Sequence, residues 1–342
     1  MPQSEDGRSL NPAKLPAVAL GLRMIPSLFN DDDHSQARRL GPTLRSLAAE
    51  GVYLGTSSWK YEGWLGTIYD RDRYVSRGRF SKKKFEADCI REYAETFPTV
   101  GADFSFYQFP APDFWSHLFT GLPEDFSFGM KVPEEITVLR WPSHARYGPR
   151  AGTTNQHFLD TSLFERAFSG VLTPHRRHVA VMMFEFGAFS RDEFPDVAAF
   201  LERLDGFLGA LPAGWPYAVE IRNEEFLGPE YFGVLARHNV AHVFNAWTRM
   251  PTLAEQIAMP GSFTADFTVV RALLRRGRGF EKAVKMFAPY GEVKEPQEET
   301  RQALREIVRH TLRTRRRAYA YVNNRLEGNA PTTIEAVASA EE

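Results

Sequence analysis

The sequence lacks several features that define whole classes of protein. Among 342 residues there is one cysteine, Cys89, which excludes a disulfide framework and fits a reducing cytoplasm. No apolar run approaches the roughly 20 residues of a membrane span, and the first residues lack the basic and then apolar pattern of a secretion signal. We therefore expect a cytoplasmic protein with no membrane contact, in which Cys89 is a buried structural thiol.

An excess of charge of one sign is also missing, and so are the motifs of cofactor and metal sites. The 42 basic and 43 acidic residues leave a net charge of −1, so no global field attracts nucleic acid or an acidic membrane. The histidines lack the paired spacing of a zinc site, and neither a glycine-rich dinucleotide fingerprint nor a Walker-type loop occurs. We expect no cofactor and no catalytic metal, and the sequence indicates no protein partner.

What is present is enough apolar material for one large core. Hydrophobic residues make up 43% and aromatic residues 13% of the chain, which excludes disorder throughout. Residues 1–48 carry five prolines and the acidic run 31–33, without sustained periodicity. We interpret them as a mobile N-terminal arm with one short helix near residues 40–49, and residues 49–342 as a single domain.

From residue 52 onward, strand-like runs alternate with helical patterns. The expected strands are 52–58, 99–106, 126–131, 178–185, 217–222, 240–245, 264–271 and 317–323. The clearest helical patterns are 84–96, 158–169, 196–211, 230–238 and 298–314. Eight β-then-α units in succession predict an α/β fold of the TIM type, a single (β/α)₈ barrel. An open doubly wound sheet is the alternative, but its phosphate fingerprint is missing after the first strand.

Several of these strands have one apolar face and one small or polar face. The run Val219 to Arg222 is the clearest case, because Glu220 and Arg222 share one face while Val219 and Ile221 share the other. Charges on a buried strand cost several kcal/mol unless they are paired or serve a ligand. The pattern therefore indicates a polar barrel interior.

A set of short motifs resembles the YecE-like family, whose members have a TIM-barrel fold and no established reaction. The matching segments run from residue 52 to residue 331: 55–59 with Tyr61 and Trp64, 104–107, 131–133, 219–222, 245–251, Arg271, and Asn323-Asn324 with Gly328. The resemblance implies the fold rather than an activity. It also implies that Arg271 points inward, which alternation leaves ambiguous because Arg271 shares a face with Phe267 and Val269.

The chain departs from the family pattern at two places. The second strand carries Gly101 and Asp103 where the family usually has a glutamate followed two residues later by an asparagine, and Glu185 replaces a usual glutamine. A carboxylate has therefore moved within the expected site.

In a barrel of this type, the carboxyl ends of the strands surround one bowl. The residues gathered there are Ser57, Asp103, Tyr107, Lys131, Glu185, Glu220, Arg222, Asn245, Arg271, Asn323 and Asn324. Glu220 or Glu185 is the candidate general base, with Lys131 as proton donor or electrostatic clamp. Arginine forks and asparagine amides suit an anionic, hydroxyl-rich ligand, and Trp59 and Trp247 offer flat rings for stacking. The alternative is a structural ion network that fills the barrel mouth.

Three functions follow from these patterns. The leading hypothesis is a metal-independent enzyme acting on a small anionic, polyhydroxylated compound such as a phosphosugar or nucleotide. The second is nucleic-acid binding or processing, suggested by the basic residues of the long 272–296 connection and by the run from Arg313 to Arg317. The third is a non-catalytic ligand sensor, for which the proline-rich arm is the only indication.

Overall fold

The computed structural model describes residues 35–339, and within them eight parallel strands close into a barrel. The barrel strands are β1 (Val52–Thr56), β4 (Thr99–Ala102), β5 (Ser127–Lys131), β6 (Val179–Glu185), β7 (Tyr217–Glu220), β8 (Ala241–Ala246), β9 (Phe267–Ala272) and β10 (Arg317–Val322). Each strand pairs with the strand that follows it in this series, and β1 closes the ring by pairing with both β10 and β4. The predicted (β/α)₈ fold is confirmed.

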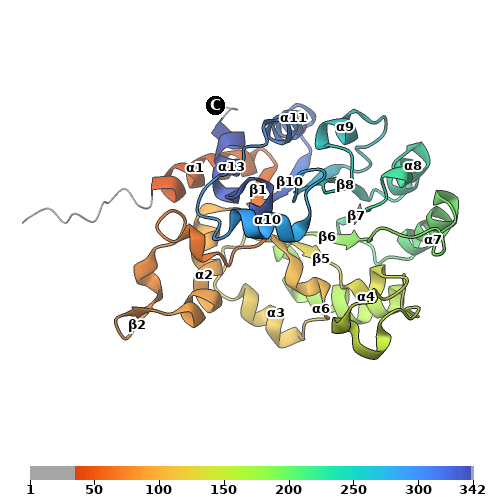
Figure 1. The fold of residues 1–342 in the computed structure, drawn as a ribbon, viewed down its shortest axis with the longest axis horizontal. Coiled ribbons are helices and arrows are strands. Elements are labelled where there is room, and N and C mark those ends of the chain that lie inside the picture. The colour runs from red at the N-terminus through yellow and green to blue at the C-terminus, as the bar shows by residue number, and fades with distance from the viewer. Residues whose placement is uncertain (1–34, 340–342) are drawn as a thin grey trace, which may run out of the picture. The chain divides into compact units, whose positions relative to one another are not determined.

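Helices follow the strands and surround the barrel (Figure 1). The longer ones are α1 (Ser35–Ala49), α2 (Lys82–Thr96), α3 (Pro112–Phe119), α7 (Val197–Gly209), α8 (Pro229–Arg237), α10 (Phe280–Phe287), α11 (Glu298–Thr314) and α13 (Ala330–Ala338). The short ones are α4 (Glu134–Thr137), α5 (Thr161–Phe164), α6 (Gly170–Leu172), α9 (Leu253–Ala258) and α12 (Asn324–Glu327). Helix α11 has the bounds that its apolar periodicity predicts.

Single-turn elements and one hairpin complete the fold. The 3₁₀ segments are η1 (Glu62–Trp64), η2 (Arg71–Tyr74), η3 (Asp103–Phe106), η4 (Ala145–Arg150), η6 (Thr173–His178) and η7 (Glu224–Phe226), and η5 (Glu165–Ser169) is a π-helical turn. Strands β2 (Val75–Ser76) and β3 (Arg79–Phe80) form the hairpin. The helix expected over 158–169 begins later, at Thr161, and the helical stretch continues through η5, α6 and η6 to residue 178.

Helix α1 contains the short helix expected near residues 40–49 and begins earlier, at Ser35. Its Leu40 and Leu44 are buried in the core, and Figure 1 shows α1 next to α13, the last helix. The Gln36 amide donates to Thr332 Oγ1 at 3.1 Å and to Glu335 Oε2 at 2.9 Å across that contact. Helix α1 is thus packed on the barrel, and the rest of the expected arm, residues 1–34, lies outside the described residues.

The barrel interior is apolar at the amino ends of the strands and charged at the carboxyl ends. An inner cluster includes Val181, Met183, Phe267, Val269 and Tyr321. The outward faces of the strands pack against the helices in a second, larger core. Small residues make room for the inner layer, because a Cβ on Gly129 would lie 2.5 Å from the ring of Tyr321. Because inward and outward positions alternate along each strand, further inward-pointing residues follow this layer at the carboxyl ends of the strands.

Candidate functional site

Six charged side chains from five strands form one network at the carboxyl end of the barrel. Asp103 directly follows β4, Lys131 ends β5, Glu185 ends β6, Glu220 ends β7, Arg222 follows β7 by two residues, and Arg271 lies near the end of β9. The register pairs Glu185 with Glu220, so two carboxylates start from neighbouring positions. Such a pair is tolerated in a buried place only if cations lie between its members.

Glu185 is the centre of this network. Its Oε2 atom contacts all three cations: Lys131 Nζ at 2.9 Å, Arg222 Nη2 at 2.9 Å and Arg271 Nη1 at 2.5 Å. Burial alone would raise the pKa of Glu185, but Arg222, Lys131 and Arg271 together hold the pKa well below its usual value. Glu185 is therefore ionised across the physiological range.

Arg271 distributes its charge among three carboxylates. Its Nη1 contacts both Glu185 and Glu220, and its Nη2 donates to Asp103 Oδ1 at 3.0 Å. Burial opposes the charged form, while Glu220, Asp103 and Glu185 raise the pKa of Arg271. The side chain points into the barrel, which resolves the ambiguity that alternation left on β9.

Arg222 is held between Glu220 and an aromatic ring. Its Nε and Nη2 atoms donate to Glu220 Oε1 at 3.0 and 2.8 Å, and its guanidinium lies 3.8 Å from the ring centroid of Trp247. Trp247 belongs to the turn after β8. Gln256 fixes this turn, because its side chain accepts from the Asn245 backbone N–H at 3.1 Å and donates to the Asn245 carbonyl at 2.8 Å. The second tryptophan chosen from the sequence thus contacts the network through Arg222.

Asp103 and Lys131 form the more open side of the network. Lys131 Nζ lies 3.8 Å from Asp103 Oδ1 and 3.8 Å from the ring centroid of Phe106. Asp103 starts η3, and Ser105 fixes this turn by donating its hydroxyl to the Lys131 carbonyl at 2.6 Å. The Asp103 side chain is 37% exposed, whereas Glu220 is 0% and the Glu185 side chain 12% exposed. Asp103 is the carboxylate of the network that solvent reaches most easily.

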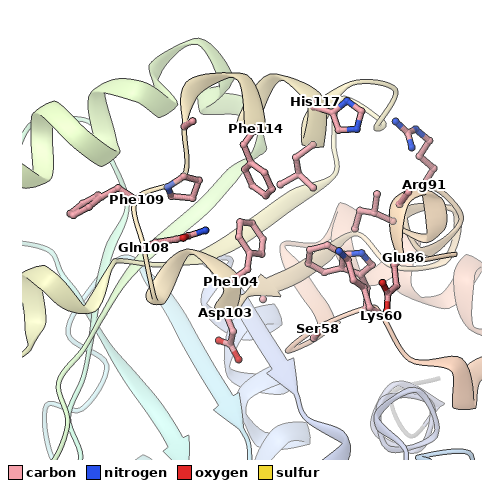
Figure 2. Close-up of a pocket in the computed structure, with 17 residues that line it drawn as sticks. Ser58, Lys60, Glu86, Arg91, Asp103, Phe104, Gln108, Phe109, Phe114 and His117 are labelled. Atoms are coloured by element: carbon pink, nitrogen blue, oxygen red, sulfur yellow. The ribbon is translucent and has the colours of Figure 1, made fainter. Parts of the chain in front are cut away.

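A cavity of about 640 Å³ adjoins the network at Asp103. It lies between the loop after β1, the end of β4, and helices α2 and α3, and much of its wall is formed by the rings of Trp59, Phe104, Phe109 and Phe114. Figure 2 shows the Asp103 carboxylate directed away from the rings of Phe104 and Phe114. Asp103 thus stands at the edge of a largely aromatic cavity, with its carboxylate turned to the side of the network. Lys60 also lines the cavity, with Nζ 5.5 Å from the Trp59 ring centroid.

Comparison with known proteins identifies the family. The profile described as protein of unknown function DUF72 matches residues 53–341. The chain belongs to the DUF72 family. The DUF72 barrel is similar to the crystal structure of a family member from Thermotoga maritima, with a TM-score of 0.56 and 20% identity over 85% of this chain and 99% of that one.

A second DUF72 structure, from Enterococcus faecalis, matches with a TM-score of 0.53 and 16% identity over 85% of this chain and 97% of the other. At these identities, the likeness shows the fold. Curated proteins give no significant sequence match. The predicted membership in a family of uncharacterised barrels is confirmed.

Two further residues selected from the sequence lie near the network of the DUF72 barrel without joining it. Asn245 is the register partner of Arg271, and its amide donates to the Ile221 carbonyl at 3.1 Å while its Oδ1 has no hydrogen-bond partner in the described residues. Ser57 is buried beside Gly101, and its hydroxyl likewise has no partner there. Polar atoms buried without partners are rare in native proteins, so both positions are available to a ligand or water.

Asn323 and Asn324 have structural partners at the ends of helices. Asn323 Oδ1 caps α12 by accepting from the Arg325 N–H at 2.9 Å, and Asn324 Oδ1 accepts from the Ala330 N–H at 2.7 Å at the start of α13. Their side-chain oxygens are thus occupied by backbone donors. Each oxygen keeps a second lone pair and each side chain keeps its amide N–H groups, so ligand binding by these two residues stays a prediction.

Tyr107 lies away from the inner face, which corrects the expected strand over 99–106. The strand ends at Ala102, and η3 breaks the alternation that would have placed Tyr107 in line with Asp103. Tyr107 is 59% exposed and lies beside Arg146 of the long connection after β5, with 4.8 Å between the guanidinium and the ring centroid. It belongs to the outer rim.

Sequence reasoning missed most of the cavity wall. Lys60, Phe114 and His117 line the cavity, and the last two lie on α3, for which no helix was expected. A usable signal was Pro112, because proline is favoured at the first position of a helix.

The basic connection after β9 is largely neutralised by glutamates. Arg275 and Arg278 both contact Glu295, at 3.4 and 2.5 Å, and Arg276 contacts Glu224 and Glu255 at 3.3 and 3.5 Å. This pairing weakens one of the two observations behind the nucleic-acid hypothesis, which stays a prediction. Within residues 35–339, no three His, Cys, Asp or Glu side chains are arranged to hold a metal ion, and no helix has the length and apolarity needed to cross a membrane.

Proposed function

We propose that this DUF72 protein is an enzyme that binds a small anionic, hydroxyl-bearing compound at the junction of the charged network and the aromatic cavity. The observation that carries the proposal is that Asp103 belongs to both: it is bound by Arg271 and faces Lys131, and it also lines the cavity. A network that served stability alone would gain nothing from an exposed carboxylate at a cavity edge, because exposed ion pairs contribute little.

The cavity supports a ligand with a flat part and a charged part. The rings of Trp59, Phe104 and Phe114 suit stacking against a planar or apolar face. Lys60 makes no ion pair with any described residue and lines the same cavity, so it is available for an anionic group. Of the two ligand types expected from the sequence, this wall favours a nucleotide over a phosphosugar, because a base has a flat face.

The exposures support a division of roles among the carboxylates. Asp103 is the group that accepts a proton from a ligand hydroxyl, since Glu220 and Glu185 are far less exposed. Lys131 and Arg271 stabilise the negative charge that develops next to Asp103. Glu185 and Glu220, expected from the sequence as candidate bases, hold the three cations in position. Metal independence remains part of the proposal.

Calorimetric titration with a panel of nucleotides, phosphosugars and sugar acids tests binding, and NMR of the bound compound during incubation tests turnover. We expect a nucleotide to bind and to be converted, and Asp103→Asn to abolish conversion while the protein stays folded. Lys60→Gln should weaken binding about tenfold without a change in the rate constant at saturation, because the Lys60 side chain contacts the anionic group of the ligand and not the reacting hydroxyl.

The matched control is Asp125→Asn, which removes an exposed aspartate at the opposite end of the barrel, before β5. It should bind and convert the ligand as the wild type does. Absence of binding across the whole panel, or unchanged conversion by Asp103→Asn, would contradict the proposal.

A further inference from the structure

A second cavity, of about 600 Å³, lies at the amino end of the barrel, opposite the charged network. It is lined by the first residues of β9 and β10, by the segment before β7, and by the turns that precede β8 and β10. The arginines of the turn before β10, Arg315, Arg316 and Arg317, all line it and are all exposed. They belong to the basic run from Arg313 to Arg317, which takes no part in the charged network or the first cavity.

The positive charge of this cavity is not neutralised by the described chain. No carboxylate in residues 35–339 forms an ion pair with Arg315, Arg316 or Arg317, in contrast to the paired arginines after β9. Asp266, the one acidic residue that residues 35–339 contribute to the lining, accepts a hydrogen bond at Oδ1 from the Asn239 amide at 3.1 Å. Three arginines and one aspartate leave an excess of two positive charges.

The backbone at Arg315 is in an unfavourable conformation for an arginine. The residue ends helix α11 with φ 53° and ψ 34°, the left-handed region in which glycine is the preferred residue. Strain of this kind at a non-glycine residue is concentrated at functional sites. A helix carboxyl end attracts positive charge by itself, but within the described residues none of the three arginine side chains bonds to a carbonyl of α11, and Arg316 bonds instead to the carbonyl of Ala265 at 3.0 Å.

We propose that this cavity binds the di- or triphosphate group of a small molecule, either free or as part of a nucleotide. Arginine forks bind phosphate oxygens in pairs, and three arginines line this one cavity. The excess positive charge attracts a polyphosphate, and the cavity volume accommodates a short one. This site is separate from the network and does not depend on the function proposed there.

Calorimetric titration with sodium tripolyphosphate, without metal ions and at low salt, is the direct test on the full chain. We expect saturable binding that weakens at least tenfold in the double variant Arg315→Gly, Arg317→Gln. Because glycine suits the left-handed turn, this variant should melt no lower than the wild type. The control Arg313→Gln removes an exposed arginine of the same run that contacts Glu306 outside the cavity, and it should change the dissociation constant less than twofold.

Further measurements distinguish free polyphosphate from a nucleotide, and distinguish this cavity from the charged network at the other end of the barrel. ATP that binds as tightly as tripolyphosphate supports recognition of the chain alone, and ATP that binds more tightly supports a nucleotide. Asp103→Asn and Lys60→Gln should leave tripolyphosphate binding unchanged. The proposal is overturned if tripolyphosphate does not bind, if the double variant binds it like the wild type, or if only a single-stranded oligonucleotide binds.

Discussion

Arg271 and Asp103 form an ion pair across the mouth of the barrel. Their strands, β9 and β4, are separated by β10 and β1 in the ring, yet Nη2 and Oδ1 lie 3.0 Å apart. The same guanidinium reaches Glu185 on β6 from the other side. One side chain thus connects strands around the barrel axis, and the network depends on the planar, forked shape of arginine.

Replacing Arg271 with lysine should therefore destabilise the protein strongly. An ammonium cannot reach Asp103, Glu185 and Glu220 together, and at least one carboxylate is left in a buried place without its partner. We expect a loss of about 3–5 kcal/mol in the free energy of unfolding, measured by urea denaturation. The control Arg276→Lys alters an exposed ion pair and should change stability by less than about 0.5 kcal/mol. Equal losses of stability in the two variants would contradict the conclusion that Arg271 stabilises the fold by pairing with three carboxylates.

Glu185→Gln should alter the response to acid. The folded pKa of Glu185 is held well below its usual value, so its contribution to stability is full above about pH 4.5 and is lost as the pH falls towards the folded pKa. Removing the charge leaves three cations with two carboxylates and should cost about 3 kcal/mol at pH 7. The difference in melting temperature between wild type and variant should shrink below pH 4. A constant difference from pH 7 to pH 3 would contradict this linkage.

The fold was predictable because the barrel strands repeat one pattern. Alternation of outward apolar and inward small or polar residues is unbroken in β5, where Phe128 and Met130 pack outside while Gly129 and Lys131 point inward. Since the carboxyl ends of parallel strands meet, this pattern also predicted that Lys131, Glu185 and Glu220 converge. Their contacts bear out the convergence and leave the roles assigned to them as proposals.

The cavity was not predictable in the same way. Part of its wall comes from η3 and α3, where alternation ends and where the aromatic segments are too short to show a helical period. Tyr107 was misplaced for this reason, because one 3₁₀ turn rotates every following side chain. Asn323 and Asn324 accept from backbone N–H groups two and six residues further along the chain, and the residue types at the end of a strand do not reveal these bonds.

His242→Phe should remove a pH dependence of stability between pH 6.5 and about 3. His242 is buried among Tyr231, Phe232 and Phe244, and burial lowers its pKa to about 3. The unfolded chain binds this proton more readily, so the stability that neutral His242 provides is full above about pH 6.5 and falls as the pH drops towards 3. At pH 5 the loss is about 2 kcal/mol. Urea denaturation at several pH values measures the slope, and an unchanged slope in the variant would exclude His242 as its source.

Two glycine substitutions should act in opposite directions. A Cβ on Gly55 in β1 would lie 2.0 Å from the Thr99 carbonyl oxygen, so Gly55→Ala forces the backbones of neighbouring strands apart and should cost about 3 kcal/mol or more. Gly206 lies inside α7 with open space around its Cβ position and a helical backbone. Gly206→Ala should stabilise the protein by about 0.5–1 kcal/mol, because alanine loses less backbone entropy on folding. Both effects are measurable by urea denaturation, and a Gly55→Ala protein as stable as the wild type would rule out the close approach of β1 and β4.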